Sequence, residues 1–139
     1  MLTLVLQDDG SISQAWGTRN EPPVDKEDAL ALAKNLNGWR RGNGKPYLLY
    51  GEMVRPEAFD CETREFPCQD GHTFVADSIL TAAYSYHGRT AQFLVNYDLV
   101  PQKVVLPPHQ SLLLDPHGEE ISPQHEIEIP AKSAICIFY

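Results

Sequence analysis

Short segments with alternating or continuous apolar residues, separated by turn residues, make up the second two-thirds of the chain. The clearest alternation spans residues 125–129, where Ile127 and Ile129 alternate with Glu126 and Glu128. This is the pattern of a strand with one face buried and the other in solvent. The segments that we expect to be extended are 46–50, which residues 51–56 continue after a break, and then 59–66, 78–86, 90–97, 102–106, 111–115, 125–129 and 133–139.

Two of these segments predict a hairpin, and another predicts a central strand. Residues 78–86 and 90–97 flank His87-Gly88-Arg89, a glycine-containing connection typical of a β-hairpin. Alternate positions of the second segment would share one face, namely Ala91, Phe93, Val95 and Tyr97. Residues 133–139 are nearly all apolar, which predicts a strand buried on both faces.

One stretch, from residue 25 to about residue 37, has the period of an amphipathic helix. Asp25 is suited to the N-cap, because the two prolines before it cannot lie inside a helix. Gly38 or Gly42 can end the helix. The apolar stripe consists of Ala29, Leu32, Ala33, Leu36 and Trp39, and the opposite face carries Lys26, Lys34 and Asn35. We therefore expect this helix to lie on an apolar surface.

Together these patterns predict a mainly β protein. The expected fold is an antiparallel β-sandwich of Greek-key type with about seven or eight strands, preceded by one amphipathic α-helix. Residues 1–45 would form an appendage of strand, loop and helix, and residues 46–139 would form the sandwich domain. Within the appendage, residues 2–6 have strand character and residues 11–23 are expected to be a loop.

Charge and hydropathy narrow the classes of partner. The 19 acidic and 11 basic residues give a net charge of −8, and no basic stripe is present, so nucleic acid is not expected as a partner. No apolar run approaches the ~20 residues of a membrane helix. Residues 1–6 are too short, and lack the basic flank, for a secretory signal. A cytoplasmic location without membrane contact is the expectation.

The cysteines suggest neither a disulfide framework nor a metal site. Cys61, Cys68 and Cys136 make an odd count, and the first two could pair only if they lie on adjacent strands. Cys136 lies in an apolar segment and is expected to be buried. Cys61, Cys68 and His72 are grouped, with Asp60 and Asp70 nearby. Structural zinc sites usually contain pairs of ligands two to four positions apart, so we expect no metal and no cofactor.

No catalytic motif is evident. Ser78, Ser85 and Ser111 lack the context of a nucleophile elbow, and His87 and His117 lie beside glycines in expected turns. The segment 42–45 (GNGK) resembles a phosphate loop, but it is expected to precede a strand rather than a helix. A carboxylate pair could hydrolyse a glycoside, but among 19 acids some close pair is unavoidable. We assign no catalytic residue.

Aromatic side chains offer one binding alternative. Exposed flat rings with polar neighbours can stack on sugars, whereas rings on alternating strand faces usually belong to the core. The candidate rings are Trp16, Trp39, Tyr84, Tyr86 and Tyr97.

Four segments in this order resemble the C-terminal end of glycoside-hydrolase-like proteins. They are 46–56 (PYLLYGEMVRP) after the helix, 78–84 (SILTAAY), 91–97 (AQFLVNY) and 127–134 (IEIPAKSA). In those proteins a (β/α)8 catalytic barrel is followed by a small antiparallel sandwich. The resemblance covers residues 25–139 and implies that the helix corresponds to the last helix of the barrel. The part that would carry the catalytic carboxylates has no counterpart here.

The resemblance implies a non-catalytic accessory sandwich that packs against a catalytic barrel. The helix would then present an apolar patch along Leu32, Leu36 and Trp39, covered by the barrel or by a second copy in a homodimer. Two alternatives stay open: a free-standing carbohydrate-binding module, recognised by an exposed row of rings, and a small independent enzyme with an acid pair in a cleft.

Overall fold

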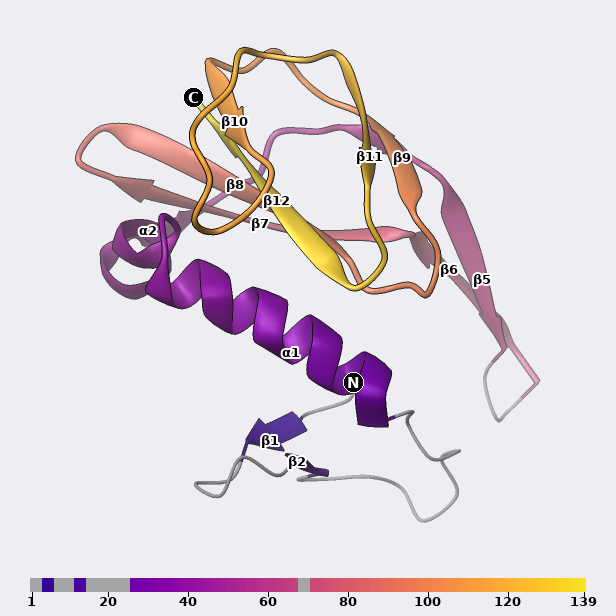
Figure 1. Cartoon of the computed structure of the whole chain (residues 1–139). Helices are drawn as coiled ribbons and strands as arrows, with labels where there is room; N and C mark the ends of the chain where they lie inside the picture. The colour runs from indigo at the N-terminus through magenta and orange to yellow at the C-terminus, as the bar shows by residue number, and fades with distance from the viewer. Residues whose placement is uncertain (1–3, 7–11, 15–25, 68–70) are drawn as a thin grey trace.

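The computed structural model describes residues 4–6, 12–14, 26–67 and 71–139. Two helices and twelve strands lie in this part of the chain (Figure 1). The helices are α1 (Lys26–Arg41) and α2 (Lys45–Tyr50). The strands are β1 (Leu4–Leu6), β2 (Ile12–Gln14), β3 (Glu52–Val54), β4 (Asp60–Cys61), β5 (Thr63–Pro67), β6 (Thr73–Asp77), β7 (Ile79–Tyr86), β8 (Arg89–Asn96), β9 (Gln102–Val105), β10 (Ser111–Leu113), β11 (Glu126–Ile129) and β12 (Ser133–Phe138).

Five strands form the central antiparallel sheet, in the order β10-β12-β8-β7-β3. Its longest pairing is the β7–β8 hairpin, which runs from Ile79 opposite Asn96 to Tyr86 opposite Arg89. His87 and Gly88 form the turn with φ angles of 50° and 78°. Positive φ at both central positions suits a two-residue hairpin turn. The hairpin predicted from the sequence is confirmed.

A second sheet of three strands, in the order β11-β9-β4, covers one face of the central sheet. Between the two sheets lies a set of buried side chains that we call the inter-sheet core: Ile79, Leu94, Val104, Leu106, Leu112, Ile129, Ile135 and Ile137. Two antiparallel sheets around a shared apolar core form a β-sandwich (Figure 1). The predicted mainly β fold, with a helix before the strands, is confirmed.

The two helices lie against the other face of the central sheet, as Figure 1 shows. The side chains buried there, the helix-side core, are Trp39, Tyr47, Ala91, Phe93, Leu113, Ala134, Cys136 and Phe138. Strand β12 contributes to both cores, because Ile135 and Ile137 point to one side and Ala134, Cys136 and Phe138 to the other. The prediction that residues 133–139 form a strand buried on both faces is therefore confirmed.

Helix α1 is longer than predicted and does not end at Gly38. Trp39 is 1% exposed, and its indole Nε1 donates a hydrogen bond to the Ala134 carbonyl at 3.2 Å. Asn35 was expected on the solvent face, but its side-chain oxygen accepts a hydrogen bond from the Ala134 backbone N–H at 3.0 Å. These two contacts attach the second half of the helix to β12. The helix ends at Arg41, and Gly42 follows it. The expected N-cap, Asp25, lies outside the described residues.

The prediction that residues 46–50 form a strand is wrong, because they form helix α2. Pro46 occupies the first turn, where its missing N–H costs nothing. The Leu48 N–H donates to the Gly44 carbonyl at 3.0 Å, and the Gly51 N–H to the Tyr47 carbonyl at 3.0 Å. This helix buries Tyr47 in the helix-side core. A five-residue apolar run is compatible with either a strand or a buried helical turn. It is too short for the spacing of its apolar residues to distinguish the two.

Three further differences concern strands. Ile12–Gln14 was expected to lie in a loop, but it forms β2 and pairs with β1; the rest of that expected loop lies outside the described residues. Residues 59–66 contain two strands, β4 and β5, rather than one. Strand β6 was not predicted, and it pairs with β5. Ten strands therefore follow α2 in the described chain instead of about seven or eight.

Candidate functional site

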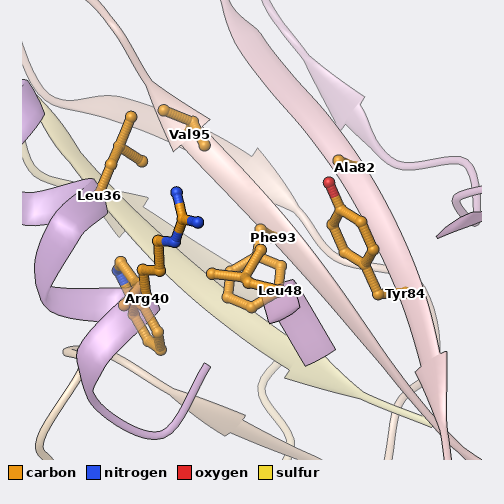
Figure 2. A pocket seen from close by; sticks show the side chains of 8 residues that line it. Leu36, Arg40, Leu48, Ala82, Tyr84, Phe93 and Val95 are labelled. Atoms are coloured by element: carbon orange, nitrogen blue, oxygen red, sulfur yellow. The ribbon is translucent and has the colours of Figure 1, made fainter. Parts of the chain in front are cut away.

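An apolar groove lies between the two helices and the central sheet, with a volume of about 350 Å³. In Figure 2, Leu36 and Arg40 enter the groove from α1, and Ala82 and Tyr84 face them from β7 across Phe93. The residues that line it are Leu36, Trp39, Arg40, Leu48, Ala82, Tyr84, Phe93 and Val95. The groove thus combines the apolar stripe of α1 with the predicted apolar face of β8.

Strand alternation places the groove floor on the helix side of the sheet. Tyr84 pairs with Ala91, and Ala82 pairs with Phe93, so these side chains point to the same face. The Trp39 and Phe93 rings meet edge to face, with centroids 5.6 Å apart and an interplanar angle of 79°. Tyr84 meets Phe93 at 6.3 Å and 68°. These aromatic contacts give the groove fixed walls.

Large apolar side chains remain exposed around the groove. Leu36 is 40% exposed and Leu80 is 56% exposed. Met53 pairs with Tyr84 at the sheet edge and is 73% exposed. Tyr50, at the end of α2, is 65% exposed. Single exposed apolar residues are ordinary, but a group of them beside an apolar groove is typical of an interaction surface.

The predicted patch along α1 is only partly present. Leu36 is exposed as expected, Leu32 is half-buried, and Trp39 is buried against the chain's own sheet. The expectation that Trp39 lies uncovered is therefore wrong. Its indole fills the space beside Phe93 instead, and the exposed apolar surface continues from Leu36 toward β7 and β3.

Basic side chains border the groove at the end of α1. Arg40 lines it, and Arg40, Arg41 and Lys45 line an adjacent hollow together with Asn37 and Leu49. Among the described residues, no carboxylate lies within ion-pair distance of these three cations. In a chain with a net charge of −8, this border is locally positive and suits a partner with carboxylates.

A charged cluster lies where the β7–β8 hairpin meets β10. The Arg89 guanidinium donates two hydrogen bonds to the Glu120 carboxylate, at 2.9 and 2.6 Å, and one to the Ser111 hydroxyl at 3.0 Å. Ser111 in turn donates to Glu120 at 2.5 Å. Hydrogen bonding by Arg89 lowers the pKa of Glu120. Burial raises the pKa of Tyr47, which lies nearby.

This cluster ties segments together rather than activating a nucleophile. Ser111 donates its proton to a carboxylate that Arg89 already neutralises, so Glu120 is a weak base there. Arg89 also lies over the Phe138 ring, 4.0 Å from its centroid. Both ends of the ion pair are satisfied by the fold.

The other candidate nucleophiles are not brought together. Ser78 is fully buried, and its hydroxyl has no hydrogen-bond partner in the described chain. His87 is exposed in the hairpin turn and packs on the Tyr86 ring at 4.2 Å. His117 is exposed, and its backbone N–H donates to the Asp115 side chain at 2.9 Å. Burial strongly raises the pKa of the Cys136 thiol, which keeps it protonated and unreactive.

The grouped metal-type residues are only partly described. Cys68 and Asp70 lie outside the described residues, Cys61 is half-buried and His72 is exposed. In the part of the chain that the structure describes, no three His, Cys, Asp or Glu residues are close enough to hold a metal ion.

The glycine-rich segment 42–45 precedes a helix, contrary to the expectation that it precedes a strand. Gly44 in this segment is packed against other groups. A Cβ at Gly44 would lie 2.7 Å from the Trp39 carbonyl oxygen and 3.1 Å from the Phe93 ring. The missing side chain therefore serves the close approach of α2 to α1 and the sheet.

Among the described residues, the candidate sugar-binding rings do not form an exposed row. Trp16 lies outside the described residues and Trp39 is buried. Tyr84 and Tyr86 are half-buried on the helix side, where Tyr86 meets Tyr47 edge to face at 6.2 Å. The Tyr97 hydroxyl donates to the Asp77 carbonyl at 3.2 Å.

No family model, curated protein or solved structure matches this chain. Within the described residues, neither helix has the length and apolar character needed to cross a membrane.

The sequence predicted only part of the groove lining. The apolar stripe of α1 and the apolar face of β8 were predicted, whereas Leu48 and the face of β7 that lies on the helix side were not. The period-two alternation of Leu80, Ala82 and Tyr84 was the signal available for β7.

Proposed function

We propose that this chain is a non-catalytic accessory β-sandwich domain of a carbohydrate-active, glycoside-hydrolase-like protein. Its helix side would pack against a catalytic (β/α)8 barrel. The observation that carries the proposal is the apolar groove between α1, α2 and β7, together with the exposed apolar side chains around it. The order of sequence motifs that resembles such proteins supports the same assignment.

The breadth of the apolar surface favours a protein domain over a small ligand. Exposed apolar side chains extend from Leu36 on α1 past Leu80 on β7 to Met53 on β3, at the edge of the sheet. A small molecule would cover the groove and leave this margin in water, whereas a packed domain would bury both. The positive border at Arg40, Arg41 and Lys45 would meet acidic groups on the barrel.

The test uses the gene from which this chain comes. We expect the reading frame upstream of Met1, or a neighbouring gene, to encode a barrel domain. The barrel and this chain, produced separately, should associate in isothermal titration calorimetry. The double variant Leu36→Glu/Leu80→Glu should weaken this association at least roughly tenfold, because it places two charges in a desolvated interface.

Both substituted positions are 40% or more exposed, so the variant should keep its fold and its melting temperature. Val75→Glu is the matched control: Val75 is 59% exposed and lies on β6, outside the groove. The proposal fails if no barrel is encoded, or if the double variant binds the barrel as tightly as Val75→Glu does. A dimer that the double variant dissociates would assign the surface to a second copy instead.

A further inference from the structure

A second hollow, of about 310 Å³, lies on the opposite face of the central sheet from the helices. Polar and apolar surfaces contribute about equally to its lining, whereas the lining of the groove is mostly apolar. We call this hollow the polar cleft. The residues that line it are Val54, Arg55, Glu57, Ala83, Ser85, Thr90, Gln92 and Tyr139. Its volume lies at the lower end of the ~300–1,000 Å³ typical of small-molecule sites.

The polar cleft occurs where the composition of this sheet face changes. On this face, Ile79 and Leu94 belong to the inter-sheet core. Farther along the same strands, toward the hairpin turn, the positions that share this face are Ala83 and Ser85 on β7 and Thr90 on β8. Small and hydroxyl-bearing side chains therefore leave a hollow with a polar floor.

Gln92 holds the walls of the polar cleft in place. Its side chain is fully buried, and its amide oxygen accepts hydrogen bonds from the Glu57 N–H at 2.9 Å and the Tyr139 hydroxyl at 3.1 Å. Its amide nitrogen donates to the Glu57 carbonyl at 2.9 Å and to the Thr81 hydroxyl at 3.2 Å. All its donors and acceptors are used, so the cleft is formed before any ligand arrives.

Two hydroxyl groups on the floor are left for a ligand. Ser85 and Thr90 face each other directly across the β7–β8 ladder. Both are half-buried, and neither hydroxyl has a hydrogen-bond partner among the described residues. A hydroxyl both donates and accepts, so this pair can bind a group of the same kind. Ser111, by contrast, is fully engaged with Arg89 and Glu120.

We infer that the polar cleft binds one neutral saccharide unit of pyranose size. Adjacent hydroxyls on a sugar ring would pair with Ser85 and Thr90, and the half-buried Tyr139 ring would pack on an apolar face of the sugar. Arg55 and Glu57 at the rim carry opposite charges, so the cleft has no net charge to select an anion. This site is independent of the groove proposed to dock a barrel.

The test is a titration of the ¹⁵N-labelled chain, followed by amide chemical shifts. The probes are methyl pyranosides of glucose, galactose, mannose and xylose, with myo-inositol as a non-sugar polyol. At least one pyranoside should shift the amides of residues 83–92. The double variant Ser85→Ala/Thr90→Val should bind this sugar roughly tenfold more weakly, because two hydrogen bonds are lost.

Among the described residues these hydroxyls have no hydrogen-bond partner, so the double variant should melt at the same temperature as the unmodified chain. Thr63→Val, an exposed position on β5, is the matched control and should not change binding. The inference is overturned if no pyranoside shifts these amides, if inorganic phosphate or glucuronate binds more tightly than every neutral sugar, or if the double variant binds unchanged. Leu36→Glu/Leu80→Glu should bind the sugar normally, which separates this test from that of the groove.

Discussion

Asn96 illustrates how one buried amide can join three segments of this chain. Its side-chain nitrogen lies 2.8 Å from the Val100 carbonyl oxygen, 3.0 Å from that of Ile129 and 3.1 Å from that of Pro130. Its side-chain oxygen accepts the Asp98 N–H at 2.9 Å. These bonds fix the end of β8 against the end of β11. Buried amides with every group paired specify a single arrangement of the backbone.

We expect the attachment of α1 to depend most on Trp39, which is buried against the sheet. Trp39→Ala should lower the free energy of unfolding by about 3–5 kcal/mol, because it leaves a cavity beside Phe93 and removes the bond to Ala134. Trp39→Phe should cost less, because it keeps an aromatic ring beside Phe93 while it removes the N–H donor and part of the buried ring volume. Urea unfolding monitored by circular dichroism measures both.

Leu36→Ala is the matched control for Trp39, since it truncates another member of the same stripe that is 40% exposed. Its cost should be well below that of Trp39→Ala. Equal costs for the two truncations would mean that α1 is not held at Trp39, and would contradict this account of the helix-side core.

At the scale of elements, the Arg89–Glu120 pair connects the β7–β8 hairpin to the segment after β10. The pKa of Glu120 is lowered, chiefly by hydrogen bonding from Arg89. A carboxyl whose pKa is lower in the folded state adds stability above its ordinary value of 4.5, and this stability is lost as the pH falls through the lowered pKa. Arg89 stays charged throughout this range.

Glu120→Gln should therefore flatten the dependence of stability on pH below pH 4.5. The effect should be at most about 1 kcal/mol, because the Arg89 and Glu120 side chains are 35% and 41% exposed and water screens the pair. Urea unfolding between pH 3 and pH 7 measures it. Glu119→Gln, at the exposed neighbouring position, should leave the dependence unchanged; an equal effect there would exclude the Arg89 pair as the cause.

Helix α2 shows how tertiary packing decides the type of an element. Tyr47 packs on Phe138, with ring centroids 5.6 Å apart, and lies 6.2 Å from Tyr86. A strand at residues 46–50 would turn alternate side chains to opposite faces. The helical turn instead buries Tyr47 and partly buries Leu48 against the sheet, and the close approach at Gly44 permits it.

For the molecule as a whole, burial is concentrated in the middle of the central sheet. Strands β8 and β12 have a strand on each side and contribute to both cores. The β5–β6 hairpin forms a separate two-stranded sheet, projects from the sandwich in Figure 1, and exposes Phe74 and Val75 by 53% and 59%. Its attachments include the ion pair between Arg64 and Asp98.

We expect backbone amides of β5 and β6 to exchange with deuterium roughly 100-fold faster than those of β8 and β12, because a two-stranded ribbon opens locally without unfolding the core. Hydrogen exchange followed by mass spectrometry measures this difference. The β7–β8 hairpin, equally a hairpin but central in the sheet, is the internal control. Equal protection of the two hairpins would mean that β5–β6 opens only with the whole molecule.

The sequence by itself determined where most strands lie and which faces they bury. The alternation of Ile127 and Ile129 with glutamates, the apolar run at residues 133–139 and the glycine turn after residue 86 each predicted the observed element. Strand alternation and turn geometry are local properties of the backbone, so a local pattern is sufficient to reveal them.

The tertiary structure alone decided the helical form of residues 46–50, the burial of Trp39 and both candidate sites. The groove needs side chains from α1, α2, β7 and β8, and the polar cleft needs Gln92 to hold Glu57 and Tyr139, which are distant in the chain. Such contacts depend on which elements meet and in which register. A local pattern carries no information about either, because each is set by packing across the whole fold.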